Sequence, residues 1–345
     1  MKRCIFVCPY YGKWPETFRE WVYTAGYLKE QNVDFLLITD LTIDFELPSN
    51  FRVLPLSFSE LQARYQQIHD FDISLNSPYK LCDFRPTMGQ VFNKELEGYD
   101  FWGHCDCDLV WGDFRAMLPD EVFEKYDRIQ YLGHCILYRN TPMMNQAYSL
   151  PGDYYSHRKV YSSPLYYSFD EHPGMLNVVL KNKITNYIGD VVADISPMYS
   201  RMRISRRNNY RHQIVYWHNG RVFRTGVDEQ DELHTDEFLY CHFQQKHPTA
   251  LDCWEEDKEP VAFILYADHL EEFDPKEITA QFVKAHSDFV SEEQDKTDRR
   301  NYLIKKIKLF LKMPLKEKLV WIRLRSATKR ATKRLPLLMG TFDPK

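Results

Sequence analysis

Short apolar runs alternate with helical patterns through the N-terminal part of the chain. Continuous apolar runs stand at residues 3–10, 33–40 and 51–56, and a fourth at 99–106 ends in Asp106. A run that is apolar on both faces is typical of a strand buried in a parallel sheet. The segments between the runs repeat apolar residues every three or four positions, as amphipathic helices do. The alternation predicts an α/β domain with a mostly parallel sheet flanked by helices.

The second half of the chain continues this pattern and adds an antiparallel element. We expect a strand over residues 128–138 and a β-hairpin over residues 213–226, with Asn219-Gly220 as its turn. Residues 150–212 are rich in Tyr, Ser, Pro and Arg, and we expect them to form ordered loops over a site. The expected helices begin after Pro15, at a capping-box pattern in 59–62, at Pro86 and near 119–127.

The composition is that of a folded protein with a substantial core. Hydrophobic residues make up 44% of the 345 residues and aromatic residues 15%, which excludes wholesale disorder. No apolar run reaches the roughly 18–20 residues of a membrane span, and the first apolar run is too short for a signal peptide. Eight cysteines without a secretion signal favour a reducing compartment, so we expect a cytoplasmic protein with free thiols.

Charge is distributed unevenly along the chain. Residues 299–334 carry 14 Lys or Arg and one acid, Glu317, which gives this segment a net charge of +13. Because the whole chain carries −4, the remainder carries −17. An acidic body argues against nucleic-acid binding. The basic segment is expected to meet an anionic partner.

Apolar residues in the basic segment recur at helical spacing on both sides of Pro314. This pattern is typical of helices that lie on an anionic membrane, and we expect the protein to be peripheral on the inner face of the cell membrane. Docking of the same apolar faces onto the acidic body is the alternative. We expect residues 266–298 to be an acidic connecting segment and 299–345 a basic amphipathic helical tail. The two apolar stripes are Ile304, Ile307 and Leu311, and Leu315, Leu319 and Ile322.

Two aspartates, Asp106 and Asp108, stand at the end of the fourth expected strand. Side chains two residues apart on extended backbone point the same way, and ligands bind beyond the carboxyl ends of strands in α/β sheets. Both carboxylates can therefore reach one hard cation such as Mn²⁺ or Mg²⁺. A zinc site built from His104, Cys105 and Cys107 is a weaker alternative, because the Cys-x-Cys spacing is unusual for zinc. A solvated turn is the third reading.

The window 79–114 resembles the donor-binding core of glycosyltransferases with the GT-A fold. In that resemblance, a basic residue and an aspartate precede a helix that leads into a strand ending in Asp-x-Asp. The N-terminal "PYYGKWPETFREW" and "DFLLITD" resemble the opening of a bacterial glycosyltransferase family found in surface-polysaccharide loci. The resemblance covers roughly residues 3–250, although Leu96-Glu97-Gly98 replaces the Gly-Gly of some related enzymes. The matching residues of the window are Lys80, Asp83, Arg85, Asp106 and Asp108.

The resemblance implies a GT-A-like catalytic domain over residues 1–265, with a donor half over 1–140 and an acceptor half over 141–265. It also implies transfer of a sugar from a nucleotide-diphosphate sugar, with UDP-sugar the expected donor, using Mn²⁺ or Mg²⁺. The acceptor would be a saccharide or a lipid-linked saccharide of a surface polysaccharide, such as capsule or lipopolysaccharide. The ends of the first two strands would hold the nucleoside: Tyr10, Tyr11, Gly12, Thr39 and Asp40.

Other roles implied by the resemblance fall on polar residues spread along the chain. Lys80 or Arg85 would face the diphosphate, although surface salt bridges would also explain these cations. His242 would be the third metal ligand, and the nearby Lys246 would reach a phosphate. Asp170 or Glu171 would remove the acceptor proton in an inverting reaction, whereas a retaining reaction needs no such base. The alternative for these two acids is stabilisation of a helix N-terminus.

Two other functional classes remain open. A nucleotidyltransferase could use the same acid pair on a sugar phosphate and would release pyrophosphate instead of a nucleoside diphosphate. A non-catalytic carbohydrate-binding protein on the membrane surface would bind its ligand without regard to manganese. Neither glycine-rich phosphate loop, Gly-x-x-x-x-Gly-Lys or Gly-x-Gly-x-x-Gly, occurs in the sequence. Sugar transfer, which does not need such a loop, is the leading hypothesis.

Overall fold

The largest element of the fold is a seven-stranded sheet with the order β3-β2-β1-β4-β7-β6-β8. The structure is a computed structural model, and it describes residues 1–256 and 258–334. The pairs β1–β2, β2–β3, β1–β4 and β6–β8 are parallel, whereas β7 is antiparallel to both neighbours. The expected α/β class with a mostly parallel sheet is confirmed. The strands are β1 (Cys4–Pro9), β2 (Val33–Thr39), β3 (Phe51–Pro55), β4 (Phe101–Cys105), β6 (Arg128–Ile129), β7 (Cys135–Arg139) and β8 (Asn186–Tyr187).

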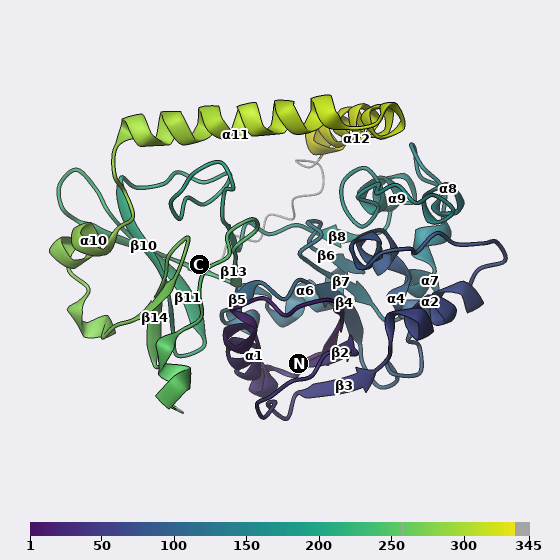
Figure 1. Cartoon of the computed structure of the whole chain (residues 1–345). Helices are drawn as coiled ribbons and strands as arrows, with labels where there is room; N and C mark the ends of the chain where they lie inside the picture. The colour runs from purple at the N-terminus through teal and green to yellow at the C-terminus, as the bar shows by residue number, and fades with distance from the viewer. Residues whose placement is uncertain (257, 335–345) are drawn as a thin grey trace.

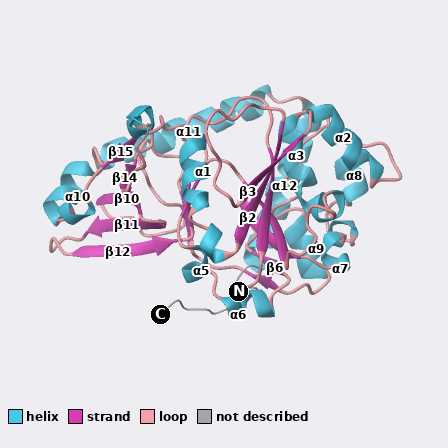
Figure 2. Cartoon of the chain, turned by 90° about the horizontal axis from the view of Figure 1, so that it is seen from below, coloured by secondary structure: helices cyan, strands magenta, loops and turns pink. Residues whose placement is uncertain are grey.

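Alternate side chains of the central strands enter two separate cores. Phe6 and Phe35 pack with Trp21 of the first helix on one face, and Ile5 packs with Leu61 on the other face. Continuous apolar runs are needed because both faces of the sheet are covered. Figure 2 shows helices on the two sides of this sheet.

Helices surround the sheets, and most of them are short. The α-helices are α1 (Phe18–Gly26), α2 (Phe58–Gln67), α3 (Leu81–Phe84), α4 (Met88–Val91), α5 (Phe114–Met117), α6 (Asp120–Lys125), α7 (Pro142–Asn145), α8 (His157–Tyr161), α9 (Met175–Lys181), α10 (Ala280–His286), α11 (Glu292–Lys312) and α12 (Leu315–Arg334). The 3₁₀ turns are η1 (Lys29–Gln31), η2 (Pro78–Lys80), η3 (Arg85–Thr87), η4 (Ala147–Ser149), η5 (Asp252–Glu256) and η6 (Pro275–Glu277).

Several expected elements differ in detail from the structure. The capping box belongs to Ser57, two residues before the expected position: Ser57 Oγ accepts from the Glu60 backbone N–H at 3.3 Å, and Glu60 Oε2 accepts from the Ser57 N–H at 2.8 Å. The predicted strand over 128–138 is divided into β6 and β7, with residues 130–134 between them. The β3 strand is an edge strand with exposed side chains, so it is less buried than expected.

A second sheet is antiparallel and contains the expected hairpin. Its order is β12-β11-β10-β14-β15, and β10 and β11 are joined by Asn219 and Gly220 with φ of 47° and 77°. Positive φ at both positions is the geometry of a type I′ turn, which Asn-Gly favours. The strands are β10 (His212–His218), β11 (Arg221–Val227), β12 (Leu233–Phe238), β14 (Ala262–Leu265) and β15 (Leu270–Glu272).

A three-stranded sheet connects the two larger ones. It has the order β5-β13-β9, with β5 (Leu109–Trp111) following β4 directly, β13 (Tyr240–His242) and β9 (Val192–Asp194). The indole N–H of Trp217 in β10 donates to the Trp111 carbonyl at 3.0 Å, which joins this sheet to the antiparallel one. Trp111 of β5, through which the two larger sheets are joined, therefore lies only a few residues beyond the end of β4.

The C-terminal helices lie across one side of the molecule. In Figure 1, α11 extends from the side of the antiparallel sheet towards α12, which lies near α8 and α9. Residues 266–298 contain β15, α10 and the first turns of α11, so α11 crosses the boundary expected between 298 and 299. The end of the expected tail, 335–345, lies outside the described residues. Among the residues described, no helix combines the length and apolarity needed to cross a bilayer.

Candidate metal centre

Asp106 and Asp108 occupy the turn between β4 and β5, and they alternate in sequence with Cys105 and Cys107. The two thiols are nearly fully buried, while about 30% of each Asp side chain is exposed. This alternation is the two-residue periodicity of extended backbone, which directs the carboxylates to one side and the thiols into the core. The Asp106 N–H donates to the His134 carbonyl at 3.0 Å, which fixes the turn against the segment before β7.

The structure brings His242 to the two aspartates. β13 pairs with β5, so that His242 lies opposite Leu109, the residue after Asp108. His242 Nε2 is 3.7 Å from Asp108 Oδ2 and 4.0 Å from Asp106 Oδ2, and the three side chains form a group able to hold a metal ion. Asp108 Oδ1 is buried without a hydrogen-bond partner, which is unusual for a carboxylate oxygen and fits a cation as its partner.

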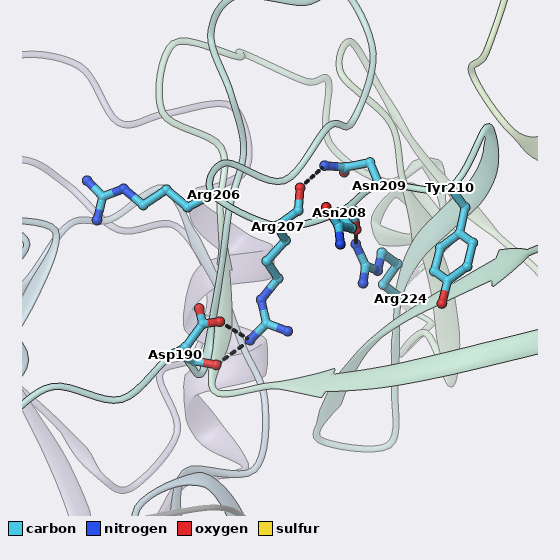
Figure 3. A pocket seen from close by; sticks show the side chains of 7 residues that line it. All are labelled: Asp190, Arg206, Arg207, Asn208, Asn209, Tyr210 and Arg224. Carbon is cyan, nitrogen blue, oxygen red and sulfur yellow. Dashed lines mark hydrogen bonds and ion pairs between the residues drawn. The ribbon is translucent and has the colours of Figure 1, made fainter. Parts of the chain in front are cut away.

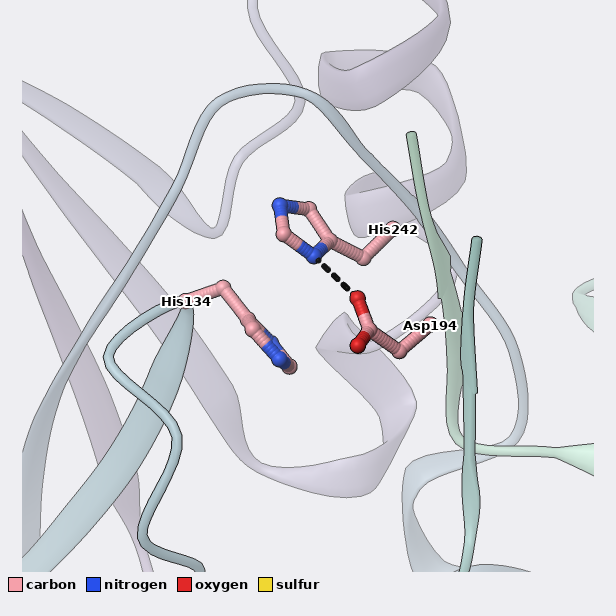
Figure 4. A group of neighbouring side chains, drawn as sticks. All are labelled: His134, Asp194 and His242. Carbon is pink, nitrogen blue, oxygen red and sulfur yellow. Dashed lines mark hydrogen bonds and ion pairs between the residues drawn. The ribbon is translucent and has the colours of Figure 1, made fainter. Parts of the chain in front are cut away.

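Asp194 at the end of β9 orients His242, and this role was not predicted from the sequence. Asp194 Oδ1 lies 2.9 Å from His242 Nδ1, because β9 and β13 pair in parallel with these two residues opposite each other (Figure 4). When Nδ1–H donates to the carboxylate, the lone pair of the neutral ring stands on Nε2, towards Asp106 and Asp108. An aspartate closing a short apolar strand, "VVAD", was the available signal.

The charges around His242 alter several pKa values. Burial disfavours the imidazolium form of His242, but the hydrogen bond with Asp194 and the charges of Asp108 and Asp106 outweigh it and raise the pKa. Burial, opposed by the charge of His242, raises the pKa of Asp108 to about 6. His134 stacks on His242 with ring centroids 4.2 Å apart, and burial holds its pKa well below the usual value. Protons therefore compete with a cation for this group near neutral pH.

A second group of three residues, His134, Asp194 and His242, could also hold a metal ion. His134 Nδ1 lies 2.8 Å from the Tyr240 hydroxyl, and His242 Nδ1 is hydrogen-bonded to Asp194. A cation in this second group would have to break the Asp194–His242 hydrogen bond. The Asp106, Asp108 and His242 group uses the other ring nitrogen and keeps that bond, so it is the better candidate.

The cysteines take no part in a metal group. Cys105 Sγ lies 3.5 Å from Cys8 Sγ inside the core, and burial raises the pKa of Cys105 well above its usual value. His104 is buried as well, and burial lowers its pKa. Within the described part of the chain, the groups able to hold a metal contain no cysteine. The geometry thus gives no support to the zinc reading of His104, Cys105 and Cys107.

Arg85 connects the candidate metal group to Asp170 and the neighbouring Glu171. Its guanidinium forms an ion pair with Asp106, lies 3.2 Å from Asp170 Oδ2 and donates to the Gly133 carbonyl at 2.7 Å. Asp170 is fully buried, and burial, opposed by Arg85, raises its pKa well above the usual value. Glu171 Oε1 accepts from the Gly133 N–H at 3.1 Å, and burial raises the pKa of Glu171 too.

Lys80 and Asp83 occupy a different environment from the expected one. Lys80 Nζ donates to Asp83 Oδ2 at 2.7 Å and to the carbonyls of Val160 and Leu165 at 3.0 and 2.5 Å. An ammonium group has three N–H donors, and these contacts use all of them. Asp83 also accepts from the backbone N–H of Tyr167. This buried pair holds the 160–169 loop in place, and its geometry gives no support to a contact of Lys80 with a diphosphate.

The residues expected to hold a nucleoside lie at the ends of β1 and β2. Tyr10 stacks on Trp14 with centroids 4.9 Å apart, and burial, followed by the charges of Cys107, Asp108 and Asp106, raises its pKa to about 12. The Tyr10 ring is therefore close to the candidate metal group. Gly12, with φ of 106°, has open space where a side chain would stand.

The other three residues of the expected nucleoside site differ in exposure. The Tyr11 hydroxyl donates to the Leu56 carbonyl at 3.1 Å. Thr39 is buried and accepts from the Leu41 N–H at 3.0 Å, whereas Asp40 is exposed. Asp40 and Gly12 are thus accessible to a ligand, while Thr39 supports the turn that presents Asp40.

Two further cations, Lys246 and Arg206, differ in their contacts. Lys246 donates to the Tyr199 carbonyl, and burial lowers its pKa, so it acts in the packing of the 199–203 loop. Arg206 was not expected from the sequence, although "RISRRNNY" is a basic cluster. It is exposed, has φ of 63°, and donates to the hydroxyl of Tyr131, whose ring packs on His172. Its charge acts on both His134 and Asp194, which places it beside the candidate centre.

A cavity of about 560 Å³ adjoins Arg206. It is lined by Asp190, by the loop from Arg206 to Tyr210 and by Arg224 of β11. In Figure 3, Arg207 points to Asp190, whereas the Arg206 guanidinium points away from the other two arginines. Arg224 is neutralised by Asp236. Arg206 therefore joins the cavity to the candidate metal centre with a cation that no carboxylate pairs among the described residues.

The fold and the site define an α/β protein with a carboxylate–histidine cluster at the carboxyl end of a central strand. The chain matches the model of a family described as "Family of unknown function (DUF6625)" over residues 6–301, and it belongs to that family. No curated protein matches the chain. The matched residues include the whole candidate centre, together with Arg85, Asp170, Glu171 and Arg206.

Proposed function

We propose that the protein is a metal-dependent glycosyltransferase that moves a sugar from a nucleotide-diphosphate sugar, UDP-sugar being the expected donor, to a saccharide or lipid-linked saccharide. The observation that carries this proposal is the convergence of Asp106, Asp108 and His242 at the carboxyl end of β4. Two carboxylates and one imidazole suit Mn²⁺, or Mg²⁺ with more water, and leave coordination positions for phosphate oxygens.

The donor would lie along the ends of β1 and β2. Tyr10 provides an aromatic face near the aspartates, and the open space at Gly12 lets a ligand approach the backbone. Asp40 is exposed and can accept from a base N–H or from ribose hydroxyls. Arg206 is our candidate for the cation that faces a diphosphate, since it is exposed and no carboxylate pairs with it among the described residues, whereas Lys80, Arg85 and Lys246 are more fully engaged with protein groups.

The bound ion would act as a Lewis acid towards the leaving nucleoside diphosphate. Asp194 keeps the His242 ring in the orientation that binds the ion. Glu171 is the better candidate for the base that removes the acceptor proton, because it is partly exposed and its raised pKa makes it a stronger proton acceptor. Asp170 is fully buried against Arg85 and acts as a positioning residue.

The proposal is tested by donor hydrolysis. The purified protein is incubated with Mn²⁺ and a panel of nucleotide sugars, and the nucleoside diphosphate released is measured with and without a chelator. Asp106→Asn and Asp108→Asn should each abolish release, whereas Asp72→Asn, at an exposed position, should not. Full activity of either site variant in chelator would contradict the metal role.

The products separate the proposed function from its alternatives. Release of pyrophosphate in place of a nucleoside diphosphate would identify a nucleotidyltransferase. Saccharide binding that is unaffected by Mn²⁺ and nucleotide, without any turnover, would identify a carbohydrate-binding protein. Product analysis by NMR would assign the anomeric configuration, and a retained configuration would remove the role of Glu171 as a base.

A further inference from the structure

The helices α11 and α12 expose a concentration of large apolar side chains. Among the described residues, 17 large hydrophobic side chains are exposed, and nine of them lie between residues 303 and 322. Scattered exposed apolar residues are normal, but this concentration on two consecutive helices indicates a contact surface. The nine residues are Leu303, Ile304, Ile307, Leu309, Leu311, Leu315, Leu319, Trp321 and Ile322, and we call them the apolar ridge.

The start of α11 is fixed to the body of the protein. Asp295 is nearly buried and forms ion pairs with Arg201 at 2.7 Å and Arg203 at 3.0 Å. One turn later, Asp298 Oδ2 accepts from the Ser200 N–H at 2.7 Å and from its hydroxyl at 2.6 Å. These contacts hold α11 on the 200–203 loop, which follows Asp194 of the candidate centre.

The far part of α12 is fixed as well. Ala327 is buried, and Val320 and Leu324 pack against the core that also contains Tyr155 and Val160. Arg330 lies over the ring of Tyr154 at 6.0 Å. Between the two fixed ends, Phe310 and Trp321 pack against each other with centroids 4.9 Å apart and hold the helices together at the Pro314 turn. The apolar ridge is therefore exposed on helices that are already docked at both ends. Figure 1 shows α11 lying along the outside of the molecule.

Exposed cations alternate with the residues of the apolar ridge along α11 and α12. Between residues 303 and 325, seven Lys and Arg side chains are exposed: Lys305, Lys306, Lys308, Lys312, Lys316, Arg323 and Arg325. Glu317 is the one acid in this stretch of sequence, and no ion pair joins these cations to a carboxylate among the residues described. The body of the chain carries −17, so the cations are not needed for solubility and are left free for an outside partner.

We infer that the apolar ridge and its cations bind the surface of an anionic lipid bilayer. An apolar ridge between cations matches the acyl boundary and the charged headgroups of such a surface, and a second copy of the same basic surface would be repelled. The alternative that both stripes dock on the body is excluded for the ridge, since its side chains are exposed. Binding of this kind is peripheral. It does not depend on the proposed enzyme activity, and through the 200–203 loop it would fix how the candidate centre faces the membrane.

The test is flotation of the full chain with vesicles. Vesicles of phosphatidylcholine with phosphatidylglycerol should bind the protein at low salt and release it at high salt, and pure phosphatidylcholine should bind it weakly. The triple variant Ile307→Ser, Leu311→Ser, Leu319→Ser should bind more than tenfold more weakly. Lys305→Gln, Lys306→Gln and Lys308→Gln should each weaken binding about fivefold, the factor that corresponds to about 1 kcal/mol per cation.

Matched controls use exposed residues away from the ridge. Val53→Ser with Met143→Ser tests the loss of apolar surface, and Lys94→Gln tests the loss of one charge. Controls should bind as the unmodified chain does. Equal binding by the ridge variants, or equal binding to neutral and anionic vesicles, would overturn the inference. A third outcome would also overturn the inference: no vesicle binding, together with a dimer that is seen by sedimentation without lipid and is lost in the triple variant. The ridge would then be a contact between two copies.

Discussion

His242 has a carboxylate near each of its ring nitrogens. Asp194 lies at Nδ1, and Asp106 and Asp108 lie at Nε2. These carboxylates therefore disfavour a neutral His242 ring that binds nothing at Nε2. They favour either a proton or a metal ion there. This competition gives the residue a measurable signature that a buried structural histidine would not have.

The affinity for Mn²⁺ should rise as the pH rises through about 6 and above. A metal ion needs Asp108 ionised and His242 neutral, and the pKa of Asp108 is raised to about 6 while that of His242 is raised above its usual value. At a pH below these pKa values, Asp108 and His242 must each lose a proton before the metal ion binds. The affinity for Mn²⁺ therefore falls by up to about tenfold per pH unit for each proton. Isothermal titration calorimetry between about pH 5.5 and pH 8 measures this change.

Asp194→Asn provides the matched variant for that titration. The amide no longer favours the imidazolium, so the pH dependence should move to lower pH, and the loss of ring orientation should weaken binding by about 10–100-fold at pH 8. A pH-independent affinity in the unmodified chain would contradict the assignment of His242 and Asp108 as ligands.

Substitutions of Lys80 and Arg206 should have different effects, the first on the stability of the fold and the second on donor binding. Lys80→Met leaves Asp83 buried without its cation, which should lower the free energy of unfolding by about 3–5 kcal/mol in urea denaturation. Arg206→Gln is at an exposed position and should change stability by less than about 0.5 kcal/mol. It should nevertheless raise the KM for the donor by about tenfold or more, as the loss of a charge-assisted hydrogen bond does.

Arg207→Gln is the control for Arg206, because this neighbouring cation is paired with Asp190. It should leave the KM for the donor unchanged. If instead Lys80→Met remains as stable as the unmodified chain and raises the KM for the donor, the original expectation for Lys80 is restored.

The site residues that could be predicted from the sequence share one property. Asp106 and Asp108 end an apolar strand, and a strand end in a parallel sheet is a position that sequence periodicity reveals. The burial of Lys80 could not be read from its sequence, since its partners Val160 and Leu165 lie far along the chain. Asp194 and Arg206 were missed because their neighbours come from β13 and Tyr131, which no local pattern connects to them.

At the scale of elements, the strands were predicted better than the helices. Buried strands need apolar side chains on both faces, and that requirement marks β1, β2 and β4 unambiguously. The division of 128–138 into β6 and β7 was missed, because Tyr131 and Leu132 continue the apolar pattern while the backbone reverses around them. Gln130, with φ of 66°, takes the left-handed conformation in this reversal.

This reversal also lies against Asp170 and Glu171, for which we propose roles in transfer, and Gly133→Ala tests its importance. An added Cβ would stand 2.7 Å from both Asp170 Oδ2 and Glu171 Oε1, closer than Cβ atoms are found in proteins. The two carboxylates must shift, so we expect the rate of sugar transfer to fall by about tenfold or more, because misplaced catalytic groups are costly. Mn²⁺ affinity, measured by calorimetry, should change little. Gly152→Ala, where the added Cβ meets Val178 at 3.2 Å, is the control.

At the scale of the whole molecule, the candidate centre lies where the sheets meet. Its ligands come from the end of β4 in the large sheet and from β13 in the three-stranded sheet, with Asp194 of β9 behind them. The class of the large sheet was predicted, since the strand–helix alternation is local. The three-stranded sheet was not predicted, because strands of three residues are too short to show a period.

A ligand that joins these sheets should stabilise the whole fold. At a concentration 100 times its dissociation constant, Mn²⁺ with UDP should add about 2.7 kcal/mol to the free energy of unfolding. The melting temperature measured by circular dichroism should rise by several degrees. Asp108→Asn should show no rise, although its melting temperature without ligand should stay close to that of the unmodified chain. A rise of equal size in Asp108→Asn would place the ion elsewhere.

The separation of Asp106 from His242 along the chain has a consequence for biosynthesis. During translation, the aspartates leave the ribosome long before β13 does, so the nascent N-terminal part of the chain has the two carboxylates without His242. Zinc fingers, by contrast, are nucleated by their metal. Here the sheets must first assemble around hydrophobic contacts, and the ion enters afterwards through carboxylates that remain partly exposed. If the centre binds manganese as proposed, metal loading would be a step of maturation that follows folding, and the cell's free manganese would set the fraction of finished chains that are loaded.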